Sequence, residues 1–234
     1  MNNYKTVFFA IGVLLVILGA FMLIPFFIQF IYGEKNSTFL SSASVTAFIG
    51  ILLVLANLEE NRKINLQQAF LLTTLSWLSI AIFGCIPFLL SDLNLSFVDS
   101  FFESMSGITT TGSTIITYLD NAPKSILIWR AILQWLGGIG VIVMAITILP
   151  LLNVGGMQLF RMESSDTTEK ILPRTREVTL IISIIYLVLT FSCGIAYWTV
   201  GMNIFDSIAH SMTTIATGGF STYSSSIGYF QNQK

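Results

Sequence analysis

Five long apolar stretches dominate the pattern of the chain. Each is free of charged residues and exceeds the roughly 20 residues that a membrane-spanning helix needs. They are Val7–Gly33, Asn36–Leu58, Ile64–Ser91, Ala131–Phe160 and Val178–Phe205. The pattern therefore predicts five transmembrane helices, near residues 7–31, 38–57, 68–90, 126–151 and 178–200.

Composition supports a membrane environment. Of the 234 residues, 54% are hydrophobic and 10% are charged, whereas about a quarter of the residues in a soluble domain are charged. A globule of this size cannot bury so much apolar surface, so the lipid bilayer is the expected partner. The net charge of −1 without a basic patch gives no indication of nucleic-acid binding.

Basic residues predict the orientation. With the N-terminus in the cytoplasm, the inside segments hold seven lysines and arginines and the outside segments hold four. The bias is clearest in the polar segment Arg161–Arg176, which has four basic residues. Cytoplasmic loops carry the excess of basic residues, so we expect a cytoplasmic N-terminus and a cytoplasmic connection at Met157–Arg176, which could also contact a regulatory subunit.

Two further segments fit neither lipid nor an ordinary charged loop. Serine and threonine make up half of Ser104–Leu119 and more than a third of Ser207–Gln233. The two segments are also copies of each other, because Asp99–Gly112 aligns without gaps to Asp206–Gly219 with half of the positions identical. Each copy follows a predicted span. Internal repeats of this kind are common in transport proteins.

Each copy predicts a short helix followed by an irregular strand. Asp99 and Asp206 are suitable N-cap residues, and the helices would end near Ile108 and Ile215. A helix C-terminus carries partial negative charge, which favours a cation, and a glycine-containing strand can turn its carbonyls toward one line. The candidate cation ligands are the backbone carbonyls of Thr110, Thr111, Gly112, Thr217, Gly218 and Gly219. Taken singly, such Ser/Thr/Gly clusters are usually loops; their repetition favours ion binding.

Three motifs resemble the TrkH/KtrB family of potassium-uptake subunits. They are the stretch Phe101–Gly112, the pattern Trp129-Arg130 followed by Gln134–Gly140, and the stretch Ile215–Thr222. The resemblance spans essentially the whole chain. It implies an all-α membrane fold of helix–pore-helix–helix repeats around one pore, with Gly112 and Gly219 as the filter glycines. Two spans precede the first repeat, as in Trk-type members.

The resemblance also implies a division of the chain and a set of partners. Residues 1–66 would form two N-terminal transmembrane helices, 67–155 the first repeat, 156–177 a cytoplasmic connecting loop and 178–234 an incomplete second repeat. Family members function in the bacterial inner membrane as homodimers with a cytosolic nucleotide-binding regulatory subunit, TrkA-like. We therefore expect potassium uptake with K⁺ as the transported ion and no other cofactor. Because the chain ends at Lys234, soon after Gly219, a truncated, non-conducting membrane fragment or interaction module is the alternative.

Several other residues have two possible roles. Glu103 lies on the first predicted pore helix, either as a functional acid or as a structural acid hydrogen-bonded behind the filter. Its counterpart His210 could sense pH or be a packed, hydrogen-bonded side chain. Arg130 is expected to be an interfacial anchor with Trp129 and Trp135.

The glycines at 137, 138 and 140 predict close packing of the fourth span against a pore helix, or alternatively a bend. Pro25 and Pro87 are expected only to kink their spans. The sequence contains no nucleophile–base pair, phosphate loop or acidic metal cluster, so no enzymatic activity is expected.

Overall fold

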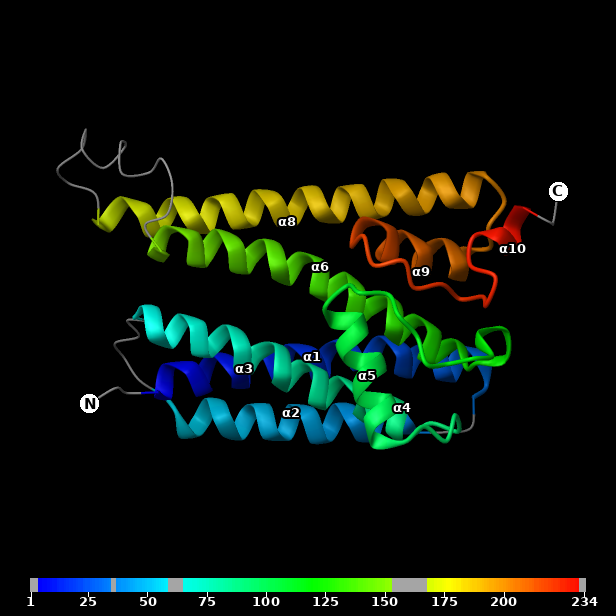
Figure 1. The fold of residues 1–234 in the computed structure, drawn as a ribbon, viewed down its shortest axis with the longest axis horizontal. Helices are drawn as coiled ribbons and strands as arrows, with labels where there is room; N and C mark the ends of the chain where they lie inside the picture. Colours follow the sequence, from blue (N-terminus) through cyan, green and yellow to red (C-terminus); the bar gives the residue numbers. More distant parts are fainter. Residues whose placement is uncertain (1–3, 35–36, 59–64, 153–167, 232–234) are drawn as a thin grey trace.

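The computed structural model describes the chain except residues 1–3, 35–36, 59–64, 153–167 and 232–234. The described residues form helices and connecting turns, without strands. Five long helices run along the longest axis of the molecule (Figure 1). They are α1 (Lys5–Tyr32), α2 (Thr38–Ala56), α3 (Leu66–Gly84) with its continuation α4 (Ile86–Leu89), α6 (Lys124–Leu152) and α8 (Thr168–Thr199). All five are long and apolar enough to cross a membrane, which confirms the five predicted spans.

Four short elements complete the described part of the fold. Two of them, α5 (Phe97–Ile108) and α9 (Ile204–Ile215), are 12-residue helices, and they begin at equivalent positions of the sequence repeat. The others are the 3₁₀ turn η1 (Leu119–Asn121) and α10 (Gly228–Gln231). In Figure 1, α5, α9 and the C-terminal segment lie toward the end of the molecule away from the start of α1. Along the longest axis of the bundle, α5 and α9 therefore lie in the half away from the start of α1.

The hairpin of α1 and α2 is packed through small residues. A methyl group added to Gly12 would lie 2.8 Å from the carbonyl oxygen of Gly50, and one added to Gly50 would lie 2.8 Å from the oxygen of Gly12. Gly19 likewise faces Ala43 and Ala47. Helices in lipid associate by such close backbone approach, since the bilayer supplies no hydrophobic driving force between them.

The two prolines have different effects on their spans. Pro25 lies inside an uninterrupted α1. Pro87 lies at the start of α4, just after the helix is interrupted at Cys85. Proline lacks a backbone N–H and cannot complete the hydrogen bond to the preceding turn, which accounts for a division of the predicted third span into α3 and α4.

The start of α8 differs from the prediction. The helix begins at Thr168, well before residue 178, the predicted start of the span, and inside the segment 156–177 predicted as a connecting loop. Glutamate, lysine and arginine are good helix formers, so a helix can continue past the apolar span into this polar sequence. The remainder of the predicted loop, residues 156–167, lies outside the described residues.

Helix α6 connects the two short helices. It packs against α1, α3, α5 and α9, while α5 also contacts α3 and α9 contacts α8. Its first half is the most buried of the five spans. Side chains of α6 are therefore placed to contact both copies of the repeat.

Candidate ion-coordinating site

The N-caps of the two short helices lie three positions before the predicted ones. The N-cap residues are Ser96 and Asn203, whose side chains accept the backbone N–H of Asp99 and Asp206. The prediction of Asp99 and Asp206 as N-caps was therefore wrong. Both aspartates occupy the third helical position. There the carboxylate accepts a hydrogen bond from the capping side chain, 2.7 Å from Ser96 and 2.6 Å from Asn203. Its negative charge also interacts favourably with the positive end of the helix dipole.

The two helices end in the same way. Thr111 N–H donates to the carbonyl oxygen of Ser106 at 3.0 Å, and the equivalent Gly218 N–H donates to Thr213 at 2.9 Å. One residue earlier, Thr110 N–H and Thr217 N–H donate to carbonyls of the last helical turn, each at 2.9 Å. The repeat of the sequence is thus also a repeat of backbone hydrogen bonds.

Backbone dihedral angles show the same correspondence. Thr110 and Thr217 have φ values of 55° and 56°, and Gly112 and Gly219 have φ values of 79° and 77°. Positive φ is a genuine outlier for a β-branched residue such as threonine. Strained backbone of this kind concentrates at functional sites, where the surrounding structure holds it in place.

The two segments after the helices meet. A methyl group added to Gly112 would lie 2.0 Å from the carbonyl oxygen of Gly218, so the backbones touch at this point and leave no room for a side chain. Thr111, Thr217 and Gly219 are exposed, while Gly218 is buried. The structure therefore brings together the two predicted filter segments, Thr110–Gly112 and Thr217–Gly219, although they lie far apart in the sequence.

Gln134 of α6 contacts both segments. Its Oε1 accepts the backbone N–H of Phe220 at 3.0 Å, and its amide packs against Gly218, where an added methyl group would come within 2.3 Å of the amide carbon. The side chain is fully buried and its Nε2 has no hydrogen-bond partner among the described residues. This glutamine fixes the second segment from behind and lies beside Gly112 of the first.

Arg130, one helical turn before Gln134, also connects the two copies. Its Nε donates to Oε1 of Glu103 on α5 at 2.6 Å, and its Nη1 donates to the carbonyl oxygen of Ser221 at 2.8 Å. The guanidinium lies 4.1 Å from the centre of the Phe220 ring. The prediction of an interfacial anchor was wrong, because Arg130 is only 1% exposed; a charge buried this deeply requires a partner, which Glu103 supplies.

Glu103 is a structural acid. Besides Arg130, its carboxylate accepts the hydroxyl of Thr114 at 2.9 Å and the backbone N–H of Ile115 at 2.9 Å. Its side chain is fully buried. The carboxylate thus holds the extended segment that follows the first filter segment, in agreement with the second of the two roles considered for it.

His210 occupies the equivalent place in the second copy. Its Nδ1 lies 2.9 Å from the carbonyl oxygen of Asp206, and its Nε2 lies 3.1 Å from Oγ of Ser221, the counterpart of Thr114. Because a carbonyl only accepts, Nδ1 carries the proton. The backbone N–H of Tyr223 donates to the same Ser221 oxygen at 3.1 Å, and with the proton of a neutral ring on Nδ1, the serine hydroxyl donates to Nε2. A neutral, packed histidine satisfies all of these contacts.

Asp206 links the second short helix to the segment after Gly219. Its carboxylate accepts the hydroxyl of Thr222 at 2.7 Å and the hydroxyl of Tyr223 at 3.1 Å. Each copy of the repeat is therefore held behind its filter segment by buried polar contacts.

At the surface nearby, the hydrogen bond from Ser224 holds the pKa of the exposed Asp120 carboxyl below its usual range.

Comparison with known proteins identifies the family. A family model described as "TrkH: Cation transport protein" matches residues 35–233. The chain belongs to the TrkH family. The Trk system potassium uptake protein TrkH of Escherichia coli (strain K12) is 40% identical over 234 residues, covering 98% of this chain and 48% of that protein. The Trk system potassium uptake protein TrkI of Halomonas elongata is 38% identical, covering 100% of this chain and 48% of that protein.

A solved TrkH structure has the same fold. The crystal structure of the potassium transporter TrkH from Vibrio parahaemolyticus matches with a TM-score of 0.86 and 37% sequence identity, covering 97% of this chain and 46% of that chain. The TrkH-family chain described here thus spans about half the length of the relatives it matches. These findings confirm the predicted family and the all-α membrane fold, and the relatives are transport proteins rather than enzymes.

The residues behind the filter segments are only partly indicated by the sequence. Gln134 belongs to one of the family motifs, but the sequence assigns it no role. The sequence also predicts Arg130 at the membrane surface rather than in a buried position. The available signal is the spacing of these two polar residues, four positions apart, at the start of an otherwise apolar span. Polar side chains on one face of a spanning helix are expected to face the protein interior.

Proposed function

We propose that this TrkH-family chain takes part in potassium uptake across the bacterial inner membrane, with K⁺ coordinated by backbone carbonyls of Thr110–Gly112 and Thr217–Gly219. The observation that carries the proposal is the pairing of these two segments. They lie side by side, share the same positive φ values and each follow the C-terminus of a 12-residue helix. Rings of such carbonyls replace the water shell of a dehydrated K⁺.

The ends of the helices favour a cation. The last carbonyls of α5 and α9, near Ile108 and Ile215, carry the partial negative charge of the helix dipole. The final carbonyls of a helix lack an intrahelical partner, and several of them accept N–H groups of the filter segments instead. The electrostatic contribution at the site thus comes from backbone dipoles.

The carboxylates nearby are engaged in other contacts. Glu103 is satisfied by Arg130, Thr114 and Ile115, and Asp206 by Asn203, Thr222 and Tyr223. Neither acid is required as a direct ligand for the ion. A site made of neutral carbonyls suits a weakly hydrated monovalent cation better than a divalent one, which prefers carboxylate ligands.

Further chain is needed to complete the ion's surroundings in this proposal. Two segments supply one side of a coordination shell, and their exposed residues Thr111, Thr217 and Gly219 are free to face additional filter segments. By resemblance to the family we place the complete transporter in the inner membrane, with a cytoplasmic N-terminus, as a homodimer that binds a TrkA-like regulatory subunit.

Substitution of the two filter glycines tests the proposal. The variants Gly112→Ala and Gly219→Ala are introduced at the native locus, with its surrounding coding sequence, in cells that lack other potassium-uptake systems. Gly112→Ala should abolish uptake, because its methyl group would collide with the Gly218 carbonyl. Gly219→Ala meets no atom within 4 Å and acts only through its positive φ, so it should reduce the preference for K⁺ over Na⁺ while some flux remains.

A matched control separates filter effects from general damage. Gly140 on α6 has open space around it, and Gly140→Ala should leave uptake unchanged. If Gly112→Ala protein reached the membrane folded and kept its preference for K⁺, the filter assignment would be wrong. If the folded wild-type protein supported no uptake at all, the alternative of a non-conducting membrane module would be favoured.

A further inference from the structure

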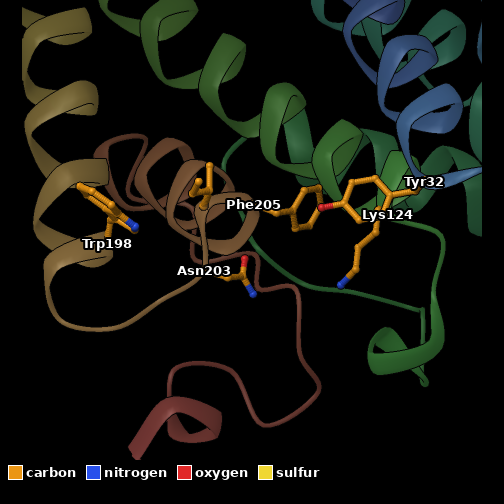
Figure 2. Close-up of a pocket in the computed structure, with 6 residues that line it drawn as sticks. Tyr32, Lys124, Trp198, Asn203 and Phe205 are labelled. Carbon is orange, nitrogen blue, oxygen red and sulfur yellow. The ribbon is translucent and has the colours of Figure 1, made fainter.

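A groove opens where α1 ends, α6 begins and α8 turns into α9. It has a volume of about 460 Å³ and is lined by Tyr32, Lys124, Trp198, Asn203, Ile204 and Phe205. Figure 2 shows that the ammonium group of Lys124 and the amide of Asn203 lie on the same side of the groove, with the Tyr32 and Phe205 rings close to the lysine. The lining thus combines one positive charge, one amide and several aromatic rings.

Aromatic rings surround the charge. The Nζ atom of Lys124 lies 5.1 Å from the centre of the Phe205 ring and 5.8 Å from that of Tyr223. Tyr32 packs edge-on against Phe205, with ring centres 5.9 Å apart. Lys124 interacts electrostatically with the Asp120 carboxylate, but within the described part of the chain it forms no salt bridge. Cation–π contacts hold the ammonium in place and leave its hydrogen atoms available to an anion.

Asn203 offers a second donor. Its Oδ1 accepts the N–H of Asp206, and its Nδ2 donates one hydrogen to the carboxylate of Asp206 at 2.6 Å. An amide nitrogen carries two hydrogens, and the residue is exposed. The second hydrogen is therefore free to bind a ligand beside Lys124.

The groove lies at the surface level of a membrane and has apolar flanks. Three spans reach this level, because α1 ends at Tyr32, α6 starts at Lys124 and α8 ends at Thr199. Large apolar side chains beside the groove are strongly exposed, with Phe30 84%, Ile31 73% and Ile204 66% exposed. Aromatic and basic residues at this depth contact lipid headgroups, while the apolar residues face acyl chains.

We propose that this groove binds an anionic phospholipid, with the phosphate at Lys124 and Asn203 and the acyl chains along the exposed apolar residues of α1 and α8–α9. Charge selects the occupant, since an ammonium–phosphate contact is a strong charge-assisted hydrogen bond that a lipid with a zwitterionic headgroup satisfies less well. The apolar flanks distinguish a lipid from a free phosphate ion, which would use only the two donors. The lipid would sit against the N-cap of α9, and its binding does not require ion conduction.

Quenching of Trp198 fluorescence tests the proposal, because this residue lines the groove and is 59% exposed. The chain is reconstituted in phosphatidylcholine vesicles containing a fixed fraction of phosphatidylglycerol. The same amount of bromine is carried either on the acyl chains of phosphatidylglycerol or on those of phosphatidylcholine, so that surface charge stays constant. The signal lost in Trp198→Phe defines the contribution of Trp198 among the four tryptophans.

In the wild-type chain, brominated phosphatidylglycerol should quench the Trp198 signal with about a fivefold preference over brominated phosphatidylcholine, as expected for one lysine at a membrane surface. Lys124→Gln should abolish the preference, and Lys124→Arg should keep most of it. Lys5→Gln, at the opposite end of α1, should change nothing. Equal quenching by the two lipids in the wild type, or an unchanged preference in folded Lys124→Gln, would overturn the proposal.

Two solution conditions give a readout that does not depend on a variant folding. Raising the NaCl concentration should weaken the preference, because salt screens an exposed charge. Sodium phosphate at matched ionic strength should weaken it no further. A larger loss with phosphate than with NaCl would assign the groove to free phosphate, and a preference insensitive to salt would rule out the contact with Lys124.

Discussion

The Nε atom of Arg130 on α6 lies 2.6 Å from Oε1 of Glu103 on α5, and both side chains are buried. The same guanidinium donates to the carbonyl oxygen of Ser221 in the second copy of the repeat. One residue of a shared helix thus connects α5 of the first copy to the segment that follows Thr217–Gly219 in the second. Together with Gln134, it makes the position of one filter segment depend on the other.

Removal of Arg130 should be strongly destabilising. Arg130→Leu leaves the Glu103 carboxylate buried without its cationic partner, and loss of one partner of a buried pair costs about 3–5 kcal/mol. The cost is measured by unfolding the protein in detergent and monitoring the loss of its helical circular dichroism signal. Thr114→Val removes a hydrogen bond from a neutral hydroxyl to the Glu103 carboxylate and should cost less, about 1.5–3 kcal/mol. Equal costs for the two variants would contradict a central role for the ion pair.

Gln134→Leu should loosen the second filter segment locally. The substitution removes the acceptor of Phe220 N–H, and a buried donor left without a partner costs about 1–3 kcal/mol. Hydrogen exchange of the Phe220 amide should accelerate about 5-fold or more, while the amides of α1 and α2 stay protected. Gln134→Glu keeps an acceptor oxygen and serves as the control. Unchanged exchange at Phe220 in folded Gln134→Leu would show that this hydrogen bond does not hold the segment.

Two glycines on α6 should respond in opposite ways to alanine. A methyl group on Gly137 would lie 1.9 Å from the carbonyl oxygen of Ile108, at the end of α5, so Gly137→Ala must push the two helices apart and should cost about 1–3 kcal/mol. Gly140 has no atom within 4 Å of the added group, and alanine there should stabilise the helix by about 0.5–1 kcal/mol. Thermal unfolding of both variants checks the difference in sign. The contact of Gly137 with the end of α5 agrees with the predicted close packing of this span, whereas Gly140 takes no part in it.

The hairpin of α1 and α2 depends on Gly12. Gly12→Leu would place its side chain against the Gly50 carbonyl and Leu53, both within 2.9 Å of the first added carbon. The two helices should separate at a cost of about 1–3 kcal/mol. A disulfide-trapping experiment between cysteines introduced on facing positions of α1 and α2 should show slower cross-linking. Val13→Leu, on the neighbouring exposed position, should cross-link at the wild-type rate.

The sequence by itself determined the spans, the repeat and the ends of the two short helices. These features are local: a run of apolar residues about 20 long has no stable alternative to a helix in lipid, and Asp99–Gly112 and Asp206–Gly219 could be matched residue by residue. The same local reasoning placed the N-caps three positions too late, because aspartate suits both the cap and the first turn. Only the neighbouring side chains of Ser96 and Asn203 distinguish the two positions.

Tertiary structure decided what lies behind the filter segments. Arg130 meets partners 27 and 91 residues away, and Gln134 meets Phe220 86 residues away. An arginine at the start of a span is compatible with the membrane surface or with a buried ion pair, and the packing of both α5 and α9 against α6 selects the second. The choice depends on which helices adjoin, and that is set by how all the spans fit together rather than by any one stretch of sequence.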